Sequence, residues 1–131
     1  MAVAQTKAAS YIQEHTEEIS SHHIISLLLE GALERIDQAV EANTNERFED
    51  LMILTNKLVA IINGLRNSLN MEVGGEIAVN LDGLYQYMVQ RITQCSLDDI
   101  VEALLEVRDL LGEIKAGWDN MDVSALQMPA A

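Results

Sequence analysis

Apolar residues recur along most of the chain at alternating spacings of four and three positions. This spacing predicts amphipathic α-helices, because side chains three and four positions apart lie on one face of a helix. Four such stretches follow one another. Their apolar stripes are Ile25, Leu29, Ala32, Ile36 and Ala39; then Leu51, Thr55, Leu58, Ile62, Leu65 and Leu69; then Ile77, Leu81, Leu84, Met88 and Ile92; and finally Ile100, Leu104, Val107, Leu111, Ile114 and Trp118.

Turn and cap residues separate these stretches. We expect the first long helix to begin after Ser20 and to end in the turn at residues 42–45. The second runs over residues 46–69, and the Gly74-Gly75 pair separates it from a third over residues 76–94. Ser96 and Asp99 form a capping-box-like start for the fourth. Four helices joined by short loops predict an all-α, antiparallel four-helix bundle, in which 4-and-3 spacing is the required pattern.

The two ends of the chain differ from this pattern. Residues 1–18 read as an amino-terminal arm or short helix around Tyr11 and Ile12, whose apolar face is too small to fold alone. Residues 19–118 form the predicted bundle domain. Beyond Trp118 the periodicity ends, so we expect residues 119–131 to be a flexible tail.

The amino-acid composition supports an all-helical domain and excludes some classes of binding partner. The 131 residues include one proline, Pro129, and only 4% aromatics, so the core must be built from aliphatic side chains. The formal net charge of −13 repels phosphate backbones and anionic lipid, which argues against nucleic-acid and membrane-surface roles. The longest weakly polar run, residues 58–65, is far shorter than the ~20 residues of a membrane span. Cys95 is the only cysteine, which fits a reducing cytosol.

The faces opposite the apolar stripes are of two kinds. On the first and fourth helices they are acidic: Glu30, Glu34, Asp37 and Glu41, then Asp98, Glu102, Glu106, Asp109 and Glu113. On the second and third helices they are small and neutral, with a single charge: Ile53, Asn56, Ala60, Asn63, Gly64 and Asn67, then Val79, Asp82, Gly83, Gln86, Gln90 and Thr93. Glycine inside a helix costs ~1 kcal/mol relative to alanine. We therefore predict that another polypeptide, a second copy of the chain or the amino-terminal arm covers this side; an ordinary neutral surface is the alternative.

One flank of the third stripe is also unusual. It carries Asn80, Leu84, Tyr87 and Arg91. An arginine at the edge of an apolar seam needs a carboxylate or carbonyl partner, either within the chain or on a bound peptide.

The sequence lacks the residue patterns of an enzyme. A di-iron bundle needs paired Glu-x-x-His motifs, and the chain has none. Cys95 stands alone, and the glycine pair is not followed by the residues of a phosphate-binding loop. A phosphotransfer histidine would have to be His22 or His23, both at a helix start. We expect no enzyme activity, no cofactor and no metal.

The stretch from Ser68 to Arg91, SLNMEVGGEIAVNLDGLYQYMVQR, resembles the signature of the flagellar secretion chaperones of the FliS family. Two further stretches, HHIISLLLEGAL and LLEVRDLLGEIKAGW, are similar to that family's first and last helices. The resemblance covers about residues 11 to 118. Ser21 departs from it, standing where the family usually has a proline.

The resemblance implies a cytoplasmic, non-enzymatic bundle that binds the disordered carboxy-terminal region of flagellin, prevents premature polymerisation and aids delivery to the flagellar type III export apparatus. It also allows export-gate components, a co-chaperone or a weak homodimer. The alternative is an adaptor that binds another flagellar or regulatory protein through the same groove. The residues expected at the partner-binding site are Tyr11, Ile12, Ile53, Asn56, Ala60, Asn63, Gly64, Asn80, Gly83, Leu84, Tyr85, Tyr87, Met88 and Arg91.

Overall fold

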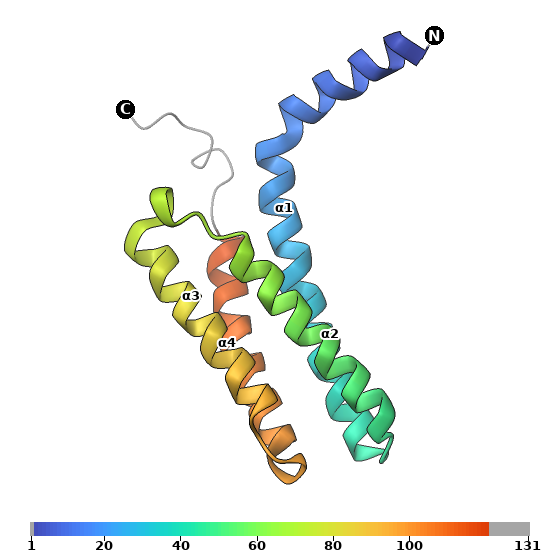
Figure 1. The fold of residues 1–131 in the computed structure, drawn as a ribbon, viewed down its shortest axis with the longest axis vertical. Coiled ribbons are helices and arrows are strands. Elements are labelled where there is room, and N and C mark those ends of the chain that lie inside the picture. Colours follow the sequence, from blue (N-terminus) through green and yellow to red (C-terminus); the bar gives the residue numbers. More distant parts are fainter. Residues whose placement is uncertain (1, 121–131) are drawn as a thin grey trace.

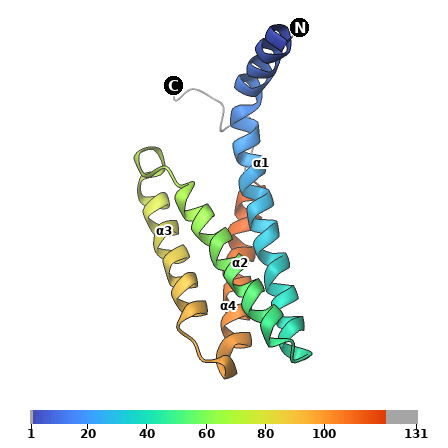
Figure 2. The same cartoon turned by 45° about the vertical axis from the view of Figure 1, so that its right-hand side comes forward.

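The computed structural model describes the backbone of residues 2–120 and the side chains of residues 22–120. Its helices are α1 (Ala2–Thr44), α2 (Phe48–Asn67), α3 (Met71–Thr93) and α4 (Ile100–Asp119), with a 3-10 turn, η1 (Leu97–Asp99), before α4. The helices alternate in direction, and α1 extends well past the ends of the other three (Figure 1). Helix α1 packs against α2 and α4, α2 packs against α3, and α3 packs against α4. This arrangement, visible again in Figure 2, is the predicted antiparallel four-helix bundle.

The helix start predicted after Ser20 is wrong. Helix α1 is continuous from Ala2 to Thr44. The physical reason is that residues 2–30 contain no proline and no glycine, and serine at positions 20 and 21 is tolerated inside a helix as well as at its start. The division between an arm and a bundle domain at residue 18 stays a prediction.

The core is made by the predicted stripes of α1, α2 and α4 together with Met88 and Ile92 of the α3 stripe. Its fully enclosed side chains come from all four helices and are almost entirely aliphatic: Leu29, Ile36, Leu51, Leu58, Ile62, Leu65, Met88, Leu104, Val107 and Leu111. Ile25, Leu69, Ile114 and Trp118 pack around this core at its edge. Burial of such side chains is the main favourable term in folding, at about 25 cal/mol per Å² of apolar surface.

Helix α3 departs from its predicted stripe in its amino-terminal half. Between residues 71 and 84 only Ala78 is buried. Ile77 and Leu84, both predicted to face inward, are 72% and 37% exposed. The inward positions of the other half are taken by Tyr85, Met88 and Ile92. The amino-terminal half of α3 therefore stands partly off the bundle, and its apolar face has no complete cover.

The glycine pair breaks the helix as predicted, but α3 already begins at Met71 and not at Glu76. Gly75 has φ 53° and ψ −128°, a non-helical conformation that separates a first turn from the rest of α3. A Cβ on Gly74 would lie 2.7 Å from the Cβ of Ala78, so Gly74 is needed for close approach. The Asn70 side chain accepts hydrogen bonds from the amides of Glu72 and Val73, both at 3.1 Å, and caps the first turn.

The capping box predicted at Ser96 is not formed. Ser96 precedes the 3-10 turn η1, and its side chain makes no capping bond to a backbone amide. Its hydroxyl instead donates to Asp99 Oδ2 at 3.0 Å. The intervening 3-10 turn delays the start of α4 to Ile100, which moves the serine too far from the α-helical amides to cap them.

Candidate protein-binding surface

The neutral face predicted on α2 and α3 lies open. Asn56, Ala60 and Asn63 are exposed, Ile53 is 47% exposed, and Gly64 is half-buried. Gly83 is exposed on α3. Other described side chains leave the face uncovered, so it is available to a second polypeptide.

The single charge on this face is neutralised within the chain. Asp82 of α3 accepts a hydrogen bond from Arg66 Nε of α2 at 2.5 Å. The same carboxylate accepts a bond from Gln86 Nε2 at 3.3 Å. The contact with Arg66 joins α2 to α3, whereas the contact with Gln86 lies within α3. The Asp82 carboxylate is therefore paired within the chain.

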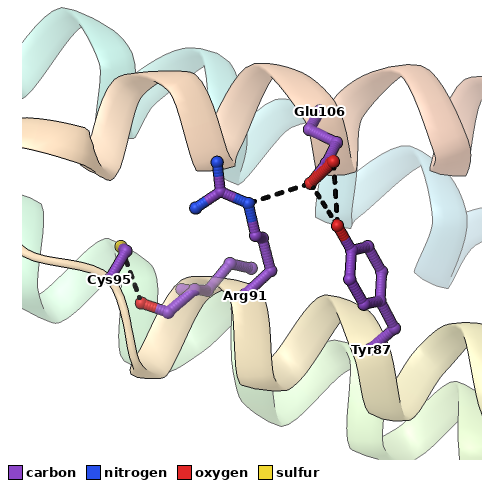
Figure 3. Close-up of polar contacts among 5 residues, drawn as sticks. Tyr87, Arg91, Cys95 and Glu106 are labelled. Carbon is purple, nitrogen blue, oxygen red and sulfur yellow. Dashed lines mark hydrogen bonds and ion pairs between the residues drawn. The ribbon is translucent and has the colours of Figure 1, made fainter.

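Tyr87 and Arg91 lie on the other flank of α3, where they contact α4 (Figure 3). The Tyr87 hydroxyl donates to Glu106 at 2.8 and 2.9 Å. Arg91 Nε donates to Glu106 Oε2 at 3.0 Å. The hydrogen bond to Glu106 raises the pKa of Tyr87, because it stabilises the neutral phenol and because ionisation would place two negative charges together.

This cluster answers the question that the sequence left open for Arg91. Its carboxylate partner is Glu106 of the same chain. Glu106 was predicted as part of a solvated acidic face, and that assignment is wrong because the side chain turns toward α3 and is only partly exposed. Tyr87 and Arg91 therefore hold α3 against α4, and any partner meets them already paired.

Two of the predicted surface residues are core residues. Tyr85 and Met88 are 3% and 0% exposed. They share the inward face of α3 with Ile92, because positions three and four apart lie together on a helix. Burial also raises the pKa of Tyr85. Met88 is out of reach of a partner in this conformation, and Tyr85 is almost entirely so. Both side chains support the surface from below.

The remaining predicted residues are placed as follows. Asn80 is exposed and Leu84 is 37% exposed on α3. Tyr11 and Ile12 fall within helix α1, but their side chains lie outside the described part of the structure. The predicted set therefore divides between the neutral α2–α3 face, the α3–α4 seam and the core.

The sequence reasoning missed two apolar grooves. The first, here called the α2–α3 groove, has a volume of about 420 Å³ and is lined by Leu51, Met52, Thr55, Asn56, Val59, Ile92, Thr93, Cys95, Ser96, Leu97 and Ile100. Met52 and Leu97 on its rim are 65% and 58% exposed. The sequence feature that could have indicated this groove is Met52, an apolar residue outside the core stripe of α2. This groove continues the neutral face toward the α3–α4 loop, and Asn56 belongs to both.

The second, here called the open-end groove, has a volume of about 360 Å³ and lies where α2 ends, α3 begins and α4 ends. Its lining residues are Ile25, Leu29, Leu65, Ser68, Leu69, Asn70, Val73, Gly74, Ile77, Ala78, Leu81, Tyr85, Ile114 and Trp118. It exists because the amino-terminal half of α3 stands off the bundle. Ile77, which was predicted to be an inward-facing core residue, instead lines this open groove and is 72% exposed.

Next to the open-end groove, His22 of α1 packs against Trp118 of α4. Their rings stack with centroids 4.8 Å apart and an interplanar angle of 13°. Trp118 Nε1 donates to the His22 carbonyl at 3.0 Å, and His22 Nε2 lies 3.1 Å from the Trp118 carbonyl. Because α1 is continuous, His22 and His23 lie within the helix and not at its start, where the sequence pattern had placed them. His22 is packed against Trp118, and His23 is exposed.

No metal-binding cluster occurs within the described side chains, where no three His, Cys, Asp or Glu residues come together. Cys95 is half-buried beside the core, and its Sγ lies 3.3 Å from the Ile92 carbonyl. None of the helices, as far as they are described, is long and apolar enough to cross a membrane.

The fold and surface define a helical bundle with an uncharged, exposed face. The family comparison is specific: the chain matches the model described as flagellar protein FliS over residues 3–125. It is 41% identical to flagellar secretion chaperone FliSB of Pseudomonas aeruginosa over 110 residues, which cover 84% of this chain and 87% of the relative. It is 37% identical to flagellar secretion chaperone FliS of Vibrio cholerae over 112 residues, 86% of this chain and 82% of that one.

A third relative, flagellar secretion chaperone FliS of Salmonella typhimurium, is 34% identical over 107 residues, 81% of this chain and 79% of that one. The chain belongs to the FliS family of flagellar secretion chaperones, as its signature stretch predicted. It is a chaperone and not an enzyme.

Proposed function

We propose that this protein binds the disordered carboxy-terminal region of flagellin in the cytosol, prevents its premature polymerisation and aids its delivery to the flagellar type III export apparatus. The family supplies the chaperone role. The observation that carries the choice of ligand is the neutral α2–α3 face and its groove, exposed on a protein with a net charge of −13.

The chemistry of this face suits an amphipathic segment. Helix-in-groove binding needs an apolar channel with room for a second backbone. The α2–α3 groove supplies exposed Met52 and Leu97, and Ala60, Gly64 and Gly83 continue the surface with small side chains. A covering helix would bury apolar atoms at about 25 cal/mol per Å², and the Asp82 carboxylate on this face is already paired with Arg66.

A disordered ligand has a further requirement. Ordering such a segment costs conformational entropy at the moment of binding, so a long interface is needed. The neutral face extends over most of α2 and α3, which provides that length. Polymerisation is blocked because the apolar faces that would join flagellin subunits are covered by the chaperone.

Titration calorimetry with a peptide of the flagellin carboxy-terminal region tests this proposal. We expect Ala60→Glu and Gly64→Arg to weaken binding by roughly tenfold or more, equivalent to about 1.4 kcal/mol, because each places a charge where the peptide would lie. The matched control is Ala116→Glu, which makes the same change at an exposed alanine of α4. Circular dichroism checks that every variant keeps its helical content and melting temperature.

The outcomes separate the two functions that the sequence allowed. Weakened binding for Ala60→Glu with normal binding for Ala116→Glu supports the α2–α3 face. Equal binding by all variants would move the docking surface elsewhere. No heat and no shift in melting temperature at saturating peptide would defeat the flagellin proposal in favour of an adaptor for another flagellar or regulatory protein.

The exposed acidic residues of α1 and α4 lie outside this binding surface. Glu30 and Glu34 on α1 and Glu102 and Asp109 on α4 are all exposed. They leave room for a second partner while flagellin is bound, such as an export-gate component or a co-chaperone. A weak homodimer would compete with flagellin for the neutral face, and sedimentation with and without peptide would detect that competition.

A further inference from the structure

Arg91 has hydrogen-bonding capacity beyond its pair with Glu106. A guanidinium carries five N–H donors, and the bond to Glu106 at 3.0 Å uses only the one on Nε. Within the described residues, no hydrogen bond engages the two terminal nitrogens of Arg91. No buried side-chain nitrogen in this part of the chain lacks a partner, so these terminal nitrogens are open to solvent. Figure 3 shows them on the side of the guanidinium that points away from Glu106 and Tyr87.

Arg91 lies in a small polar pocket on the outer side of α3. The pocket has a volume of about 240 Å³ and is lined by Tyr87, Gln90, Arg91, Gln94 and Cys95. Gln90 and Gln94 are exposed, and each side-chain amide offers two donors and one acceptor oxygen. The pocket is therefore rich in hydrogen-bond donors and contains no carboxylate among its lining residues.

This pocket adjoins the surface on which the proposed function places the partner. Gln90 belongs both to the pocket and to the neutral face of α3. Cys95 lines both the pocket and the α2–α3 groove. A polypeptide that leaves the groove and crosses the outer side of α3 therefore reaches the free donors of Arg91.

The charges around Arg91 favour an uncharged acceptor. Glu106 already neutralises the guanidinium, and the chain has a net charge of −13. A second carboxylate would gain little from a neutralised pair and would be repelled by the field of the protein. A main-chain carbonyl costs far less to desolvate than a carboxylate. The last carbonyls of a helix lack partners within the helix and form its negative end, so they suit an arginine.

We propose, building on the proposed function, that the terminal nitrogens of Arg91 bind main-chain carbonyls at the carboxyl end of a helix that the flagellin segment forms on this face. The amides of Gln90 and Gln94 complete the set of donors. The pocket thus caps the helix of a ligand that is disordered before binding, and it fixes the position at which that helix ends.

Titration calorimetry with the flagellin carboxy-terminal peptide tests this site. Arg91→Lys keeps the charge and the ability to pair with Glu106 but lacks the planar fork of donors. We expect it to weaken peptide binding by roughly tenfold. The matched control is Arg108→Lys, at an exposed arginine that pairs with Asp37 at 3.0 Å between α4 and α1, and its affinity should equal that of the unsubstituted protein.

The calorimetric outcomes separate this site from the proposed function. Normal binding by Arg91→Lys would overturn the assignment of Arg91 and leave the flagellin proposal intact. Absence of binding by every protein, the unsubstituted one included, would defeat the flagellin proposal and the capping site together.

A modified peptide distinguishes a carbonyl from a carboxylate. In this peptide every aspartate and glutamate is replaced by its amide, and the carboxyl terminus is amidated. Arg91→Lys should weaken the binding of this peptide by the same factor. If the effect of the substitution disappears, the acceptor is a carboxylate of the ligand and the carbonyl assignment is wrong.

Side-chain NMR of the unsubstituted protein gives a readout that a change in stability cannot produce. The protein carries isotope-labelled arginine, and the Arg91 signals are identified by their loss in Arg91→Lys. Saturating peptide should slow rotation of the two terminal amino groups of Arg91 and resolve their separate N–H signals, while the signals of Arg108 stay unchanged. Terminal signals of Arg91 that remain averaged at saturation would refute the capping site.

Discussion

Gly75 provides the sharpest test of how the sequence shapes α3. Its backbone has φ 53° and ψ −128°, a region that residues with a Cβ rarely occupy. A Cβ added there would meet no heavy atom within 4 Å. The cost of Gly75→Ala is therefore purely conformational, about 1–3 kcal/mol for a residue held in a sparsely populated region. Alanine also stabilises the fold by about 0.4–1 kcal/mol by restricting the unfolded chain, which leaves a net loss of up to about 2.6 kcal/mol.

Gly83 is the matched control on the same helix. It lies in regular helix, is exposed, and a Cβ there would also meet nothing within 4 Å. Gly83→Ala should therefore stabilise the protein by about 1 kcal/mol, the helix-propensity difference between the two residues. One chemical change thus has opposite signs at two positions, because only the backbone conformation differs between them.

Urea unfolding followed by circular dichroism measures both effects. With a slope of about 1–3 kcal/mol per molar urea, we expect the midpoint to fall by up to about 2.6 M for Gly75→Ala and to rise by up to about 1 M for Gly83→Ala. A rise in the midpoint for both variants would refute the reasoning. It would mean that α3 runs through position 75 as ordinary helix and that Asn70 and the glycine pair do not break it.

Two further predictions concern packing and pH. Leu104 is fully buried and Leu105 is 36% exposed, so Leu104→Ala should cost about 2–5 kcal/mol in the same titration and Leu105→Ala clearly less; equal costs would contradict the assigned core. Because the bond to Glu106 raises the pKa of Tyr87, its stabilising effect is complete below the ordinary tyrosine pKa of about 10 and is lost as pH rises through the folded value. In an ultraviolet titration, Tyr87→Phe should remove one tyrosine ionisation and so identify it. Glu106→Gln should lower the pKa of that ionisation, and an unchanged pKa would disprove the contact.

Periodicity predicted the core well over the parts of the helices that pack against neighbouring helices. The stripes of α1 and α4 contain Leu29, Ile36, Leu104 and Leu111, all fully buried. A helical wheel identifies the residues that share one face. It does not tell whether a neighbouring element covers that face, which is why the prediction for Ile77 was incomplete.

The candidate surface was predicted in outline only. The residue types on the outer side of each helical wheel identified the neutral face of α2 and α3. Asn56 and Ala60 do lie exposed on this face. The same reasoning also placed Tyr85 and Met88 at the partner-binding site, although both are buried. A signature stretch contains core residues and surface residues together, and their letters alone do not separate the two.

The sequence by itself determined the all-helical class, the four amphipathic stretches, the interruption at Gly75 and the family, because these depend on spacing and on local backbone preferences. Only the tertiary structure decided which distant groups meet. Trp118 bonds to His22, 96 positions away, and Glu106 joins Tyr87 to Arg91 across the α3–α4 seam. The open-end groove likewise follows from how far α3 stands from its neighbours. That distance is set by the packing of all four helices together, so the sequence pattern of one helix cannot predict it.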